Sequence, residues 1–557
     1  MQKTGNSLRR ALLSAALAVT VLLSGCGGGT ADVSRAPDIE PEPEPEPEVV
    51  EPIPEAFRPV LGLTTDMQYH YDDEHETIVN SMVTELPGAD AATRESYPEL
   101  SEALDRFREA AHSNALDAYQ EREGVLPDVL DAGDAVQTLG GEVHSMVRRA
   151  DAKAVSIVNY WWDYSGGAHM SYGYGAVNFD TSTGAEITLE DLLTDEGKIT
   201  INSRIGEELD ALYTELAPGG MVADYLLDDY TFSIEPDGVT FWFNPYEIAA
   251  YSEGALTAKL YFDRDADMLK SDYRGDNDAW FVEIGTEIPY RFGGHSVEAW
   301  DIPDSDSPDS GWYSGFGLEF DAPEGSNRWI DRLTSSTADS EWTVPEGRNI
   351  VLDQNGGFEA HFYYARIPAG DYVVATLTME NDASTVMVYR ADGARVGEMS
   401  LTGPGSFTYP EPPADVDDWS LYDSYHVALT NPNETTLLTR FYQFGTWGGS
   451  GTYSLTPTGF QLSGKLLYNA GEYVLTLKQD LTVTRRAADD WTVSTGEEVT
   501  LPAGTAVELV ATDGESTYFR APDNVVFALA HDIPDEYPPT VDGVPENELF
   551  DGLLYAG

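Results

Sequence analysis

Residues 164–179, YSGGAHMSYGYGAVNF, carry the residue types of a catalytic or metal-binding loop: paired glycines, three tyrosines and His169. A general base or a metal-bound histidine needs partner side chains within hydrogen-bonding or coordination distance. No other histidine lies within twenty residues of His169, and Cys26 is the only cysteine of the chain. We therefore expect the ring nitrogens of His169 to hydrogen-bond to loop backbone and to fix the turn, with a catalytic role as the alternative.

Two short acidic loops have closely spaced carboxylates, as calcium loops do. They are DRDAD, with Asp263, Asp265 and Asp267, and DSDSPDSG, with Asp304, Asp306 and Asp309. Both lack the twelfth-position glutamate and the sixth-position glycine of an EF-hand, so solvated turns are the alternative to calcium. No nucleophile elbow, phosphate-binding loop or His-Glu-x-x-His motif occurs in the sequence. The residues predict a protein that is not an enzyme, with calcium as its one candidate cofactor.

The composition permits folded domains and sets the charge of the surface. The 557 residues are 41% hydrophobic and 11% aromatic, enough for packed cores. With 31 basic and 97 acidic residues the formal charge is −66. A surface this negative repels nucleic acid and favours basic partners or cations, although it also serves solubility. We expect no nucleic-acid partner.

Residues 1–25 have the parts of a bacterial signal peptide. The basic start MQKTGNSLRR precedes the apolar run ALLSAALAVTVLL, which is too short to span a bilayer as a mature helix. The sequence LSGC, which ends at Cys26, resembles the lipobox of bacterial lipoproteins. In that family the signal peptidase cuts before the cysteine, and the cysteine sulfur carries a diacylglyceryl group. We expect Cys26 to be the lipid attachment site.

Residues 26–59 are rich in proline and glutamate. Proline favours extended polyproline conformations, and like charges stiffen the chain further. We expect a tether that holds the folded part away from the membrane. Because no later stretch is apolar enough to span a bilayer, we expect the lipid to be the only anchor, on the extracytoplasmic face of a bacterial membrane.

Residues 60–292 have the pattern of an α+β domain, an antiparallel sheet with two helices. The first helix begins in SYPELSEALDRFREAAHSNALDAYQE, where Ser96 and Glu99 are spaced as a capping box and apolar residues follow on one face. The second is ITINSRIGEELDALYTEL, residues 199–216. Turns are expected at three places, Thr181 to Gly184, Thr188 to Asp191 and Pro236 to Gly238.

Helical periodicity disappears after residue 292. Residues 293–475 contain strand-like runs separated by glycine, proline and aspartate turns, which fit either a β-sandwich or a partial propeller. Residues 476–557 have short strands around tight turns and loosely resemble a small SH3-like barrel. The C-terminal half is therefore predicted to be all-β.

Three motifs occur in one order, YSGGAH (164–169), VNFDTSTGAEITLEDLL (177–193) and FNPYEIAAYSEG (243–254). Together they resemble the extracellular domain of the lysozyme-sensing anti-sigma factors of the RsiV family. That domain is also similar to the accessory domain of the peptidoglycan deacetylase PdaC. Met170 and Ala250 depart from the family pattern, and the catalytic Thr-Phe-Asp-Asp-Gly-Pro signature of the deacetylase is not in the sequence.

The resemblance implies an α+β fold and, in the sensor branch, direct binding of lysozyme. We expect the loops 164–174 and 245–251 to share one exposed face, because glycines allow close backbone approach and tyrosines supply contact area. The alternative is that the same residues define the fold from inside. The candidate binding residues are Tyr164, Gly166, Gly167, His169, Tyr172, Pro245, Tyr246, Glu247 and Tyr251.

The expected function is that of a lipid-anchored bacterial cell-surface binding protein. Its partner would be a cell-wall component or a wall-degrading protein such as lysozyme, and a basic partner suits the charge of −66. Two other functions stay open. One is an envelope hydrolase acting on wall glycan, which would need a deep pocket with two carboxylates about 5–10 Å apart. The other is a structural surface module.

Overall fold

The computed structural model describes residues 58–71, 78–131, 139–275, 278–286, 288–293, 295–303, 313–321, 349–379, 383–402, 425–469, 471–532 and 538–555. The chain divides into residues 1–55 and 56–557. The signal peptide, Cys26 and nearly all of the tether lie outside the described residues, as do Asp304, Asp306 and Asp309. No helix in the described ranges combines the length and the apolar character that crossing a bilayer requires.

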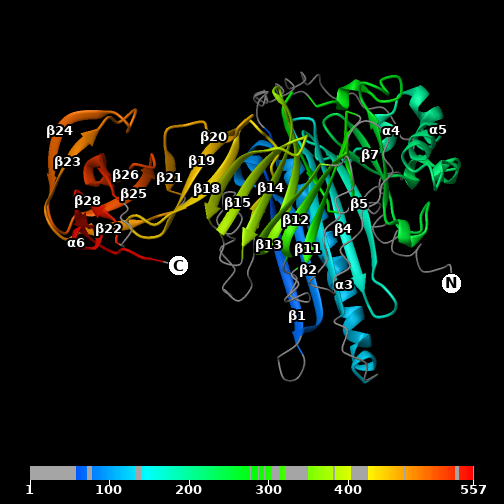
Figure 1. The fold of residues 1–557 in the computed structure, drawn as a ribbon, viewed down its shortest axis with the longest axis horizontal. Helices are drawn as coiled ribbons and strands as arrows, with labels where there is room; N and C mark the ends of the chain where they lie inside the picture. Colours follow the sequence, from blue (N-terminus) through cyan, green and yellow to red (C-terminus); the bar gives the residue numbers. More distant parts are fainter. Residues whose placement is uncertain are drawn as a thin grey trace, which may run out of the picture. The chain divides into compact units, whose positions relative to one another are not determined.

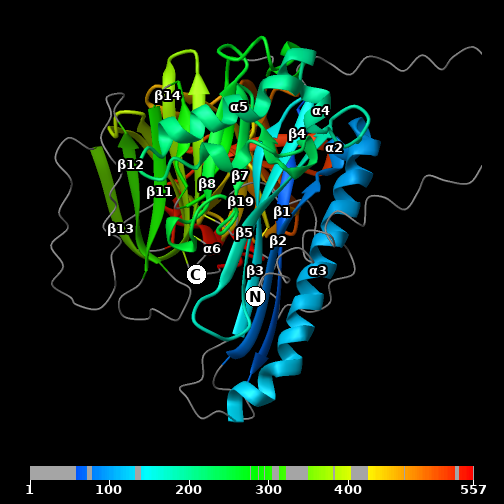
Figure 2. The ribbon, with the colours of Figure 1, turned by 90° about the vertical axis from the view of Figure 1, so that its right-hand side faces the viewer.

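A six-stranded sheet, in the order β17-β1-β2-β3-β4-β5, begins the fold. Its strands are β1 (Leu61–Tyr71), β2 (Ile78–Ala89), β3 (Leu139–Ala150), β4 (Ala154–Tyr164), β5 (Ser171–Asp180) and β17 (Tyr425–Val427). The long helix α3 (Pro98–Asp131) lies along this sheet (Figure 2). Leu100 and Leu104 of α3 share a buried cluster with Val155 and Ile157 of β4, as an apolar helical stripe predicts.

Strands β2 and β3 are parallel, whereas the other pairs of this sheet are antiparallel. Helix α3 makes the long crossover that a parallel pair requires. The short helix α2 (Ala91–Ser96) precedes it and is capped by Asp90, whose carboxylate accepts from the Thr93 N–H. The capping box predicted at Ser96 is therefore wrong. Ser96 ends α2, and α3 begins at Pro98, a position where proline loses no hydrogen bond.

A three-stranded antiparallel sheet of β6 (Thr231–Ile234), β7 (Gly238–Phe243) and β8 (Leu256–Tyr261) follows. Ile205 and Leu209 of α5 (Asp195–Leu212) are fully buried with Phe241 of β7 in one core. The predicted turns are confirmed, and Thr188 and Asp191 form a capping box at α4 (Leu189–Leu192). The short 3-10 helices of this part are η1 (Pro218–Val222), η2 (Leu227–Asp229), η3 (Tyr251–Glu253) and η4 (Ser271–Tyr273).

An eight-stranded antiparallel sheet comes next, and Figure 1 shows β11 to β15 side by side in green to yellow. Its strands are β9 (Trp280–Ile284), β10 (Tyr290–Phe292), β11 (His295–Pro303), β12 (Tyr313–Asp321), β13 (Asn349–Ile367), β14 (Gly370–Met379), β15 (Ala383–Arg390) and β16 (Arg395–Thr402). Both faces are buried, since Phe362 and Tyr363 of β13 belong to different core clusters. Because β9 pairs with β13, this sheet begins before the boundary expected at residue 293.

The remaining chain forms an eleven-stranded sheet. Its strands are β18 (Thr435–Phe441), β19 (Trp447–Thr456), β20 (Gly459–Leu462), β21 (Leu467–Asn469), β22 (Val474–Leu477), β23 (Leu481–Arg486), β24 (Ser494–Leu501), β25 (Ala506–Thr512), β26 (Ser516–Ala521), β27 (Val525–Ala530) and β30 (Phe550–Asp551). The smaller elements are η5 (Pro522–Asn524), β28 (Thr540–Val541), β29 (Val544–Pro545) and α6 (Glu546–Leu549). The described strands do not form a closed barrel, and β21 and β22 both pair with β25. The SH3-like module at residues 476–557 stays a prediction.

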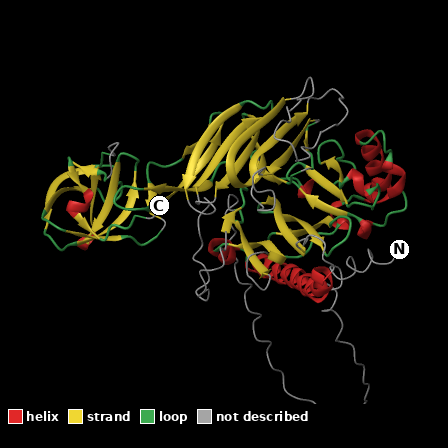
Figure 3. Ribbon diagram, turned by 60° about the horizontal axis from the view of Figure 1, so that its bottom comes forward, coloured by secondary structure: helices red, strands yellow, loops and turns green. Residues whose placement is uncertain are grey.

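Strands predominate among the described elements (Figure 3). The long helices α3 and α5 precede β6 in the sequence. The α+β class with an all-β C-terminal half is confirmed. The core of the last sheet includes Phe444 and Phe519 together, so it extends to residues before the expected boundary at 476.

Candidate binding surface

The loop between β4 and β5 is the open end of a hairpin. β4 ends at Tyr164, β5 begins at Ser171, and every residue from 165 to 170 is exposed. Gly166 and Gly167 have φ angles of +94° and +120°, which residues with a Cβ rarely adopt. The Tyr164 hydroxyl donates to the Gly167 carbonyl over 3.1 Å. These three predicted residues therefore give the loop its shape.

The segment after β7 forms a second loop. Tyr246 has a φ of +67° and a side chain that is 68% exposed. Glu247 holds the loop, because its carboxylate accepts from the Asn244 N–H (3.0 Å) and from the Tyr225 hydroxyl (3.3 Å). Pro245 is half-buried beside them. Of these predicted residues, Tyr246 projects outward, and Pro245 and Glu247 support it.

Asn244 and Tyr251 join the two loops. The Asn244 side chain accepts from the Tyr174 N–H (2.6 Å) and donates to the Tyr174 carbonyl (3.1 Å), as a neighbouring strand would at this edge of β5. The Tyr251 hydroxyl donates to the Met170 carbonyl over 2.8 Å. The Tyr251 ring also stacks on His169 with 4.1 Å between centroids. The two loops thus meet at one surface.

Ring contacts continue from this surface into the core. Tyr251 contacts Tyr172 (5.6 Å between centroids), which contacts Tyr160 (6.2 Å). Tyr160 contacts Tyr174 (5.2 Å), which stacks on the buried Trp242 (5.1 Å). Each such pair contributes about 0.5–1.5 kcal/mol beyond its buried area. This aromatic ladder fixes the outer rings before any partner binds, which lowers the entropic cost of binding.

We call His169, Met170, Tyr246 and Tyr251 the aromatic patch. The Nδ1 atom of His169 lies 2.8 Å from the Met170 carbonyl, so the ring hydrogen-bonds to loop backbone as predicted. Sequence reasoning missed the supporting residues Asn244, Tyr160, Tyr174 and Trp242. The alternation of tyrosines at 172 and 174 was a signal for their shared sheet face.

The two segments that form the aromatic patch contain no basic side chain other than His169. Residues 164–179 and 243–254 contain neither lysine nor arginine. Glu253 is exposed, whereas Glu247 turns toward its hydrogen-bond donors. Such a surface disfavours anionic ligands and suits an uncharged or a basic one.

A buried ionic centre lies where β3, β8 and β10 approach one another. The Lys259 ammonium is 2.6 Å from Glu235 and 2.8 Å from Asp237, and it donates to the Tyr290 hydroxyl over 3.1 Å. Arg148 pairs with the same Glu235. Burial alone would raise the pKa of Glu235, but Lys259 and Arg148 lower it to about 2. Burial raises the pKa of Tyr290 well above 10.

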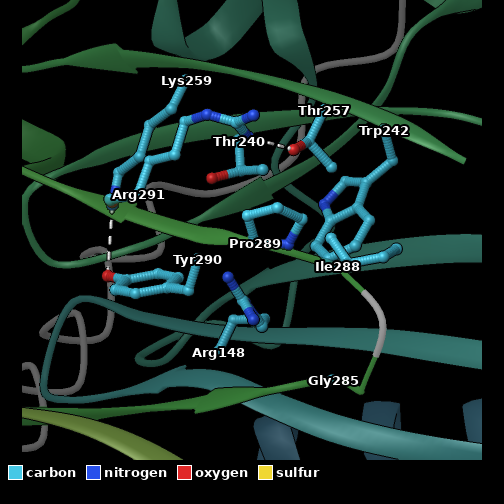
Figure 4. A pocket seen from close by; sticks show the side chains of 10 residues that line it. All are labelled: Arg148, Thr240, Trp242, Thr257, Lys259, Gly285, Ile288, Pro289, Tyr290 and Arg291. Atoms are coloured by element: carbon cyan, nitrogen blue, oxygen red, sulfur yellow. Dashed lines mark hydrogen bonds between the residues drawn. The ribbon is translucent and has the colours of Figure 1, made fainter. Parts of the chain in front are cut away.

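Figure 4 shows Arg148, Lys259 and Tyr290 around the small cavity that they line with Arg291. Its volume of about 10 Å³ is room for roughly one water molecule. A second cavity of the same volume is lined by Arg149, Asp151 and other residues. Neither space accommodates an organic substrate.

Two of the three carboxylates in the DRDAD loop pair with arginines. Asp265 is 4% exposed and accepts from Arg204 Nε over 2.8 Å, and Asp263 pairs with Arg274. Asp267 contributes its backbone carbonyl, which accepts from the Thr194 hydroxyl. Over the described ranges, no three His, Cys, Asp or Glu side chains are grouped to hold a metal ion. Calcium at either acidic loop stays a prediction.

A family model described as "Protein of unknown function (DUF3298)" matches residues 190–263, from α4 to just beyond β8. Two solved structures of DUF3298 family proteins are similar to the chain. The protein from Pseudomonas aeruginosa PAO1 is 16% identical (39% of this chain, 97% of that chain, TM-score 0.29). The protein from Bacteroides fragilis NCTC 9343 is 17% identical (38% of this chain, 94% of that chain, TM-score 0.29). No curated protein matches. The matched description assigns no function.

Proposed function

We propose that this chain is an extracytoplasmic binding protein of the bacterial envelope, which recognises its partner through the aromatic patch. The observation that carries the proposal is the meeting of two loops without lysine or arginine, about eighty residues apart in the sequence, in one exposed surface. Tyr246 is 68% exposed, so it is not a core residue. Exposed tyrosines are enriched at protein interfaces because they combine an apolar ring with a hydroxyl.

The proposed partner is a basic protein such as lysozyme. The chain carries a formal charge of −66, and no lysine or arginine occurs in either loop. Complementary potentials raise association rates and suppress wrong partners. The resemblance to the RsiV family supports the same partner, and the DUF3298 match lies in the same part of the chain. The lipid on Cys26 would hold the protein at the outer face of the membrane.

We propose binding as the activity, and not catalysis. The two cavities described above have water-sized volumes. The one carboxylate among their lining residues is Asp151, which Arg149 neutralises at 2.7 Å. A glycan hydrolase would need two carboxylates facing an open pocket.

The test is a calorimetric titration of the full-length protein with lysozyme at low and moderate salt. Tyr246→Ala and Tyr251→Ala should each weaken binding about tenfold or more, as interface tyrosines do. Tyr468→Ala is the matched control, because Tyr468 is 53% exposed and lies in β21. Absence of binding at both salt concentrations would contradict the proposal. Binding that moderate salt abolishes and that both patch variants retain would mean non-specific charge attraction.

A further inference from the structure

The first sheet has a second face, opposite α3, that presents large side chains to solvent. Strand pairing places Met67, Val83, Glu142, Trp162 and Tyr172 in one row across β1, β2, β3, β4 and β5. All five are partly exposed. We call this row, with the neighbouring Tyr69 and Tyr164, the open sheet face. At the usual strand spacing the row is roughly 19 Å long.

Side chains at the alternate positions of the same strands point to α3. His112 of α3 lies 2.7 Å from Asp66, and Arg122 of α3 pairs with Asp163. The row residues therefore lie on the face that α3 does not cover. The water-facing side of an antiparallel sheet is ordinarily polar, whereas Trp162, Tyr164 and Tyr69 are aromatic here. Contiguous exposed apolar side chains mark binding surfaces.

A polar group lies at the centre of this aromatic surface. Glu142 Oε2 accepts from the Trp162 indole N–H over 2.7 Å, and His144 Nε2 is 3.0 Å from the same oxygen. His144 Nδ1 is 3.2 Å from Glu85, and although burial lowers the pKa of His144, its two carboxylate neighbours raise it well above 6.5. Oε1 of Glu142 accepts no hydrogen bond from the described residues. The face therefore offers an acceptor oxygen beside aromatic rings.

The side chains of the open sheet face favour some classes of ligand over others. Its row contains no lysine or arginine, which disfavours phosphate-bearing and other anionic polymers. The two cavities described above lie among other residues. A sugar ring has an apolar C–H side that stacks on aromatic rings and a rim of hydroxyls that donate to carboxylates. Tryptophan and tyrosine have the matching combination of an apolar body and a polar tip.

We propose that the open sheet face binds a linear, uncharged polysaccharide, with sugar rings stacked on Trp162 and Tyr69 and a hydroxyl donated to Glu142. This site lies beside the aromatic patch, since Tyr172 contacts both Tyr160 of the ladder and Tyr251 of the patch. It goes beyond the proposed function, because its key residues are not those of the patch. One protein would thereby hold an uncharged glycan on the sheet and a protein partner on the loops.

The experiment titrates the full-length protein with N-acetylated chitohexaose and follows binding by calorimetry. Trp162→Ala and Tyr69→Ala should each weaken binding about tenfold. Tyr246→Ala, in the aromatic patch, and Tyr468→Ala, in β21, should bind as the wild type does. Circular dichroism checks folding, and if Trp162→Ala does not fold, Tyr69→Ala decides, because the 38% exposed Tyr69 lies near the end of β1.

Absence of hexasaccharide binding in the millimolar range overturns the inference, as does equal affinity of the wild type and Tyr69→Ala. Loss of lysozyme binding in Trp162→Ala without any hexasaccharide binding would assign the face to a protein partner and also overturn it. If lysozyme binding depends on Tyr246 and no hexasaccharide binds, the result supports the proposed function and contradicts the glycan site. The two conclusions are therefore tested separately.

Discussion

At the scale of single residues, Tyr246 combines an unfavourable backbone with an outward side chain. A φ of +67° costs a residue with a Cβ about 1–3 kcal/mol relative to ordinary backbone. Because the side chain is 68% exposed, its burial offsets little of this backbone free energy. Its ring contact with Tyr251, at 5.4 Å, keeps it over the patch. Contact with a partner explains a tyrosine at this position better than stability does.

We therefore expect Tyr246→Asn to separate stability from binding. Asparagine tolerates the left-handed region, so the unfolding free energy should stay unchanged or rise by up to about 1 kcal/mol. Lysozyme binding should weaken about tenfold with the loss of the ring. Urea denaturation and calorimetric titration measure the two effects. A clear fall in stability would show that the Tyr246 ring serves packing.

Lys259 is the residue whose loss should damage the fold most. Lys259→Met leaves Glu235 buried with one cationic partner fewer, and breaking such a pair costs about 3–5 kcal/mol of unfolding free energy. Lys198→Met is the matched control, because Lys198 pairs with the exposed Glu190. That pair should contribute less than about 1 kcal/mol. Equal effects of both variants in urea denaturation would argue against the buried ionic centre.

His144 should make the unfolding free energy decrease as the pH rises into the alkaline range. Its pKa is raised in the folded chain, so its contribution is complete below the unfolded value of about 6.5 and is lost as the pH rises through the folded value. As the pH rises above about 6.5, the unfolding free energy of the wild type should fall more steeply than that of His144→Gln. Parallel pH profiles of the two proteins would contradict the Glu85–His144–Glu142 geometry.

At the scale of elements, local patterns predicted the helices and turns near the site. The apolar stripe predicted for α5 is confirmed at Ile205 and Leu209, which are fully buried. The predicted helix continued to Leu216, but the structure ends α5 at Leu212, and Ala217 has a φ of +42° before Pro218. The apolar spacing continues past the end of the helix, so the following proline is the only local signal of the change in backbone direction. Leu216 is 40% exposed in consequence.

The β4–β5 hairpin gives a prediction at this scale. Gly167→Ala puts a Cβ on backbone with a φ of +120°, which should lower the unfolding free energy by about 1–3 kcal/mol and weaken patch binding. Gly175→Ala, in the same hairpin, is the control, because its φ is ordinary and its Cβ would meet no atom within 4 Å. Chemical denaturation of both variants is the measurement. Similar losses in the two proteins would show that the φ of Gly167 does not require glycine.

At the scale of the whole molecule, pairings between distant segments had no local signal. β17 pairs with β1 across more than three hundred and fifty residues, and β9 joins a sheet beyond the expected boundary. The sequence identified the patch tyrosines by type and by motif, but the aromatic ladder depends on the register of β4 against β5 and on Asn244 at the strand edge. Register follows from the packing of whole faces, which a single stretch does not contain.

The charge of −66 predicts that long-range attraction raises the association rate of the whole chain with a basic partner. The association rate with lysozyme should fall at least about tenfold from low to moderate salt, because the Debye length shortens to about 8 Å. Tyr246→Asn should act mainly on the dissociation rate, since short-range contacts set it. Surface plasmon resonance at several salt concentrations measures both rates. An association rate independent of salt would show that the net charge plays no part in recognition.

The most direct test of the central claim is hydroxyl-radical footprinting of the full-length protein with and without lysozyme. We expect oxidation of Met170, Tyr246 and Tyr251 to decrease in the complex, while oxidation of Tyr468, which is 53% exposed, does not change. Unchanged oxidation of the three patch residues, together with protection elsewhere on the chain, would contradict the assignment of the two loops as the binding surface.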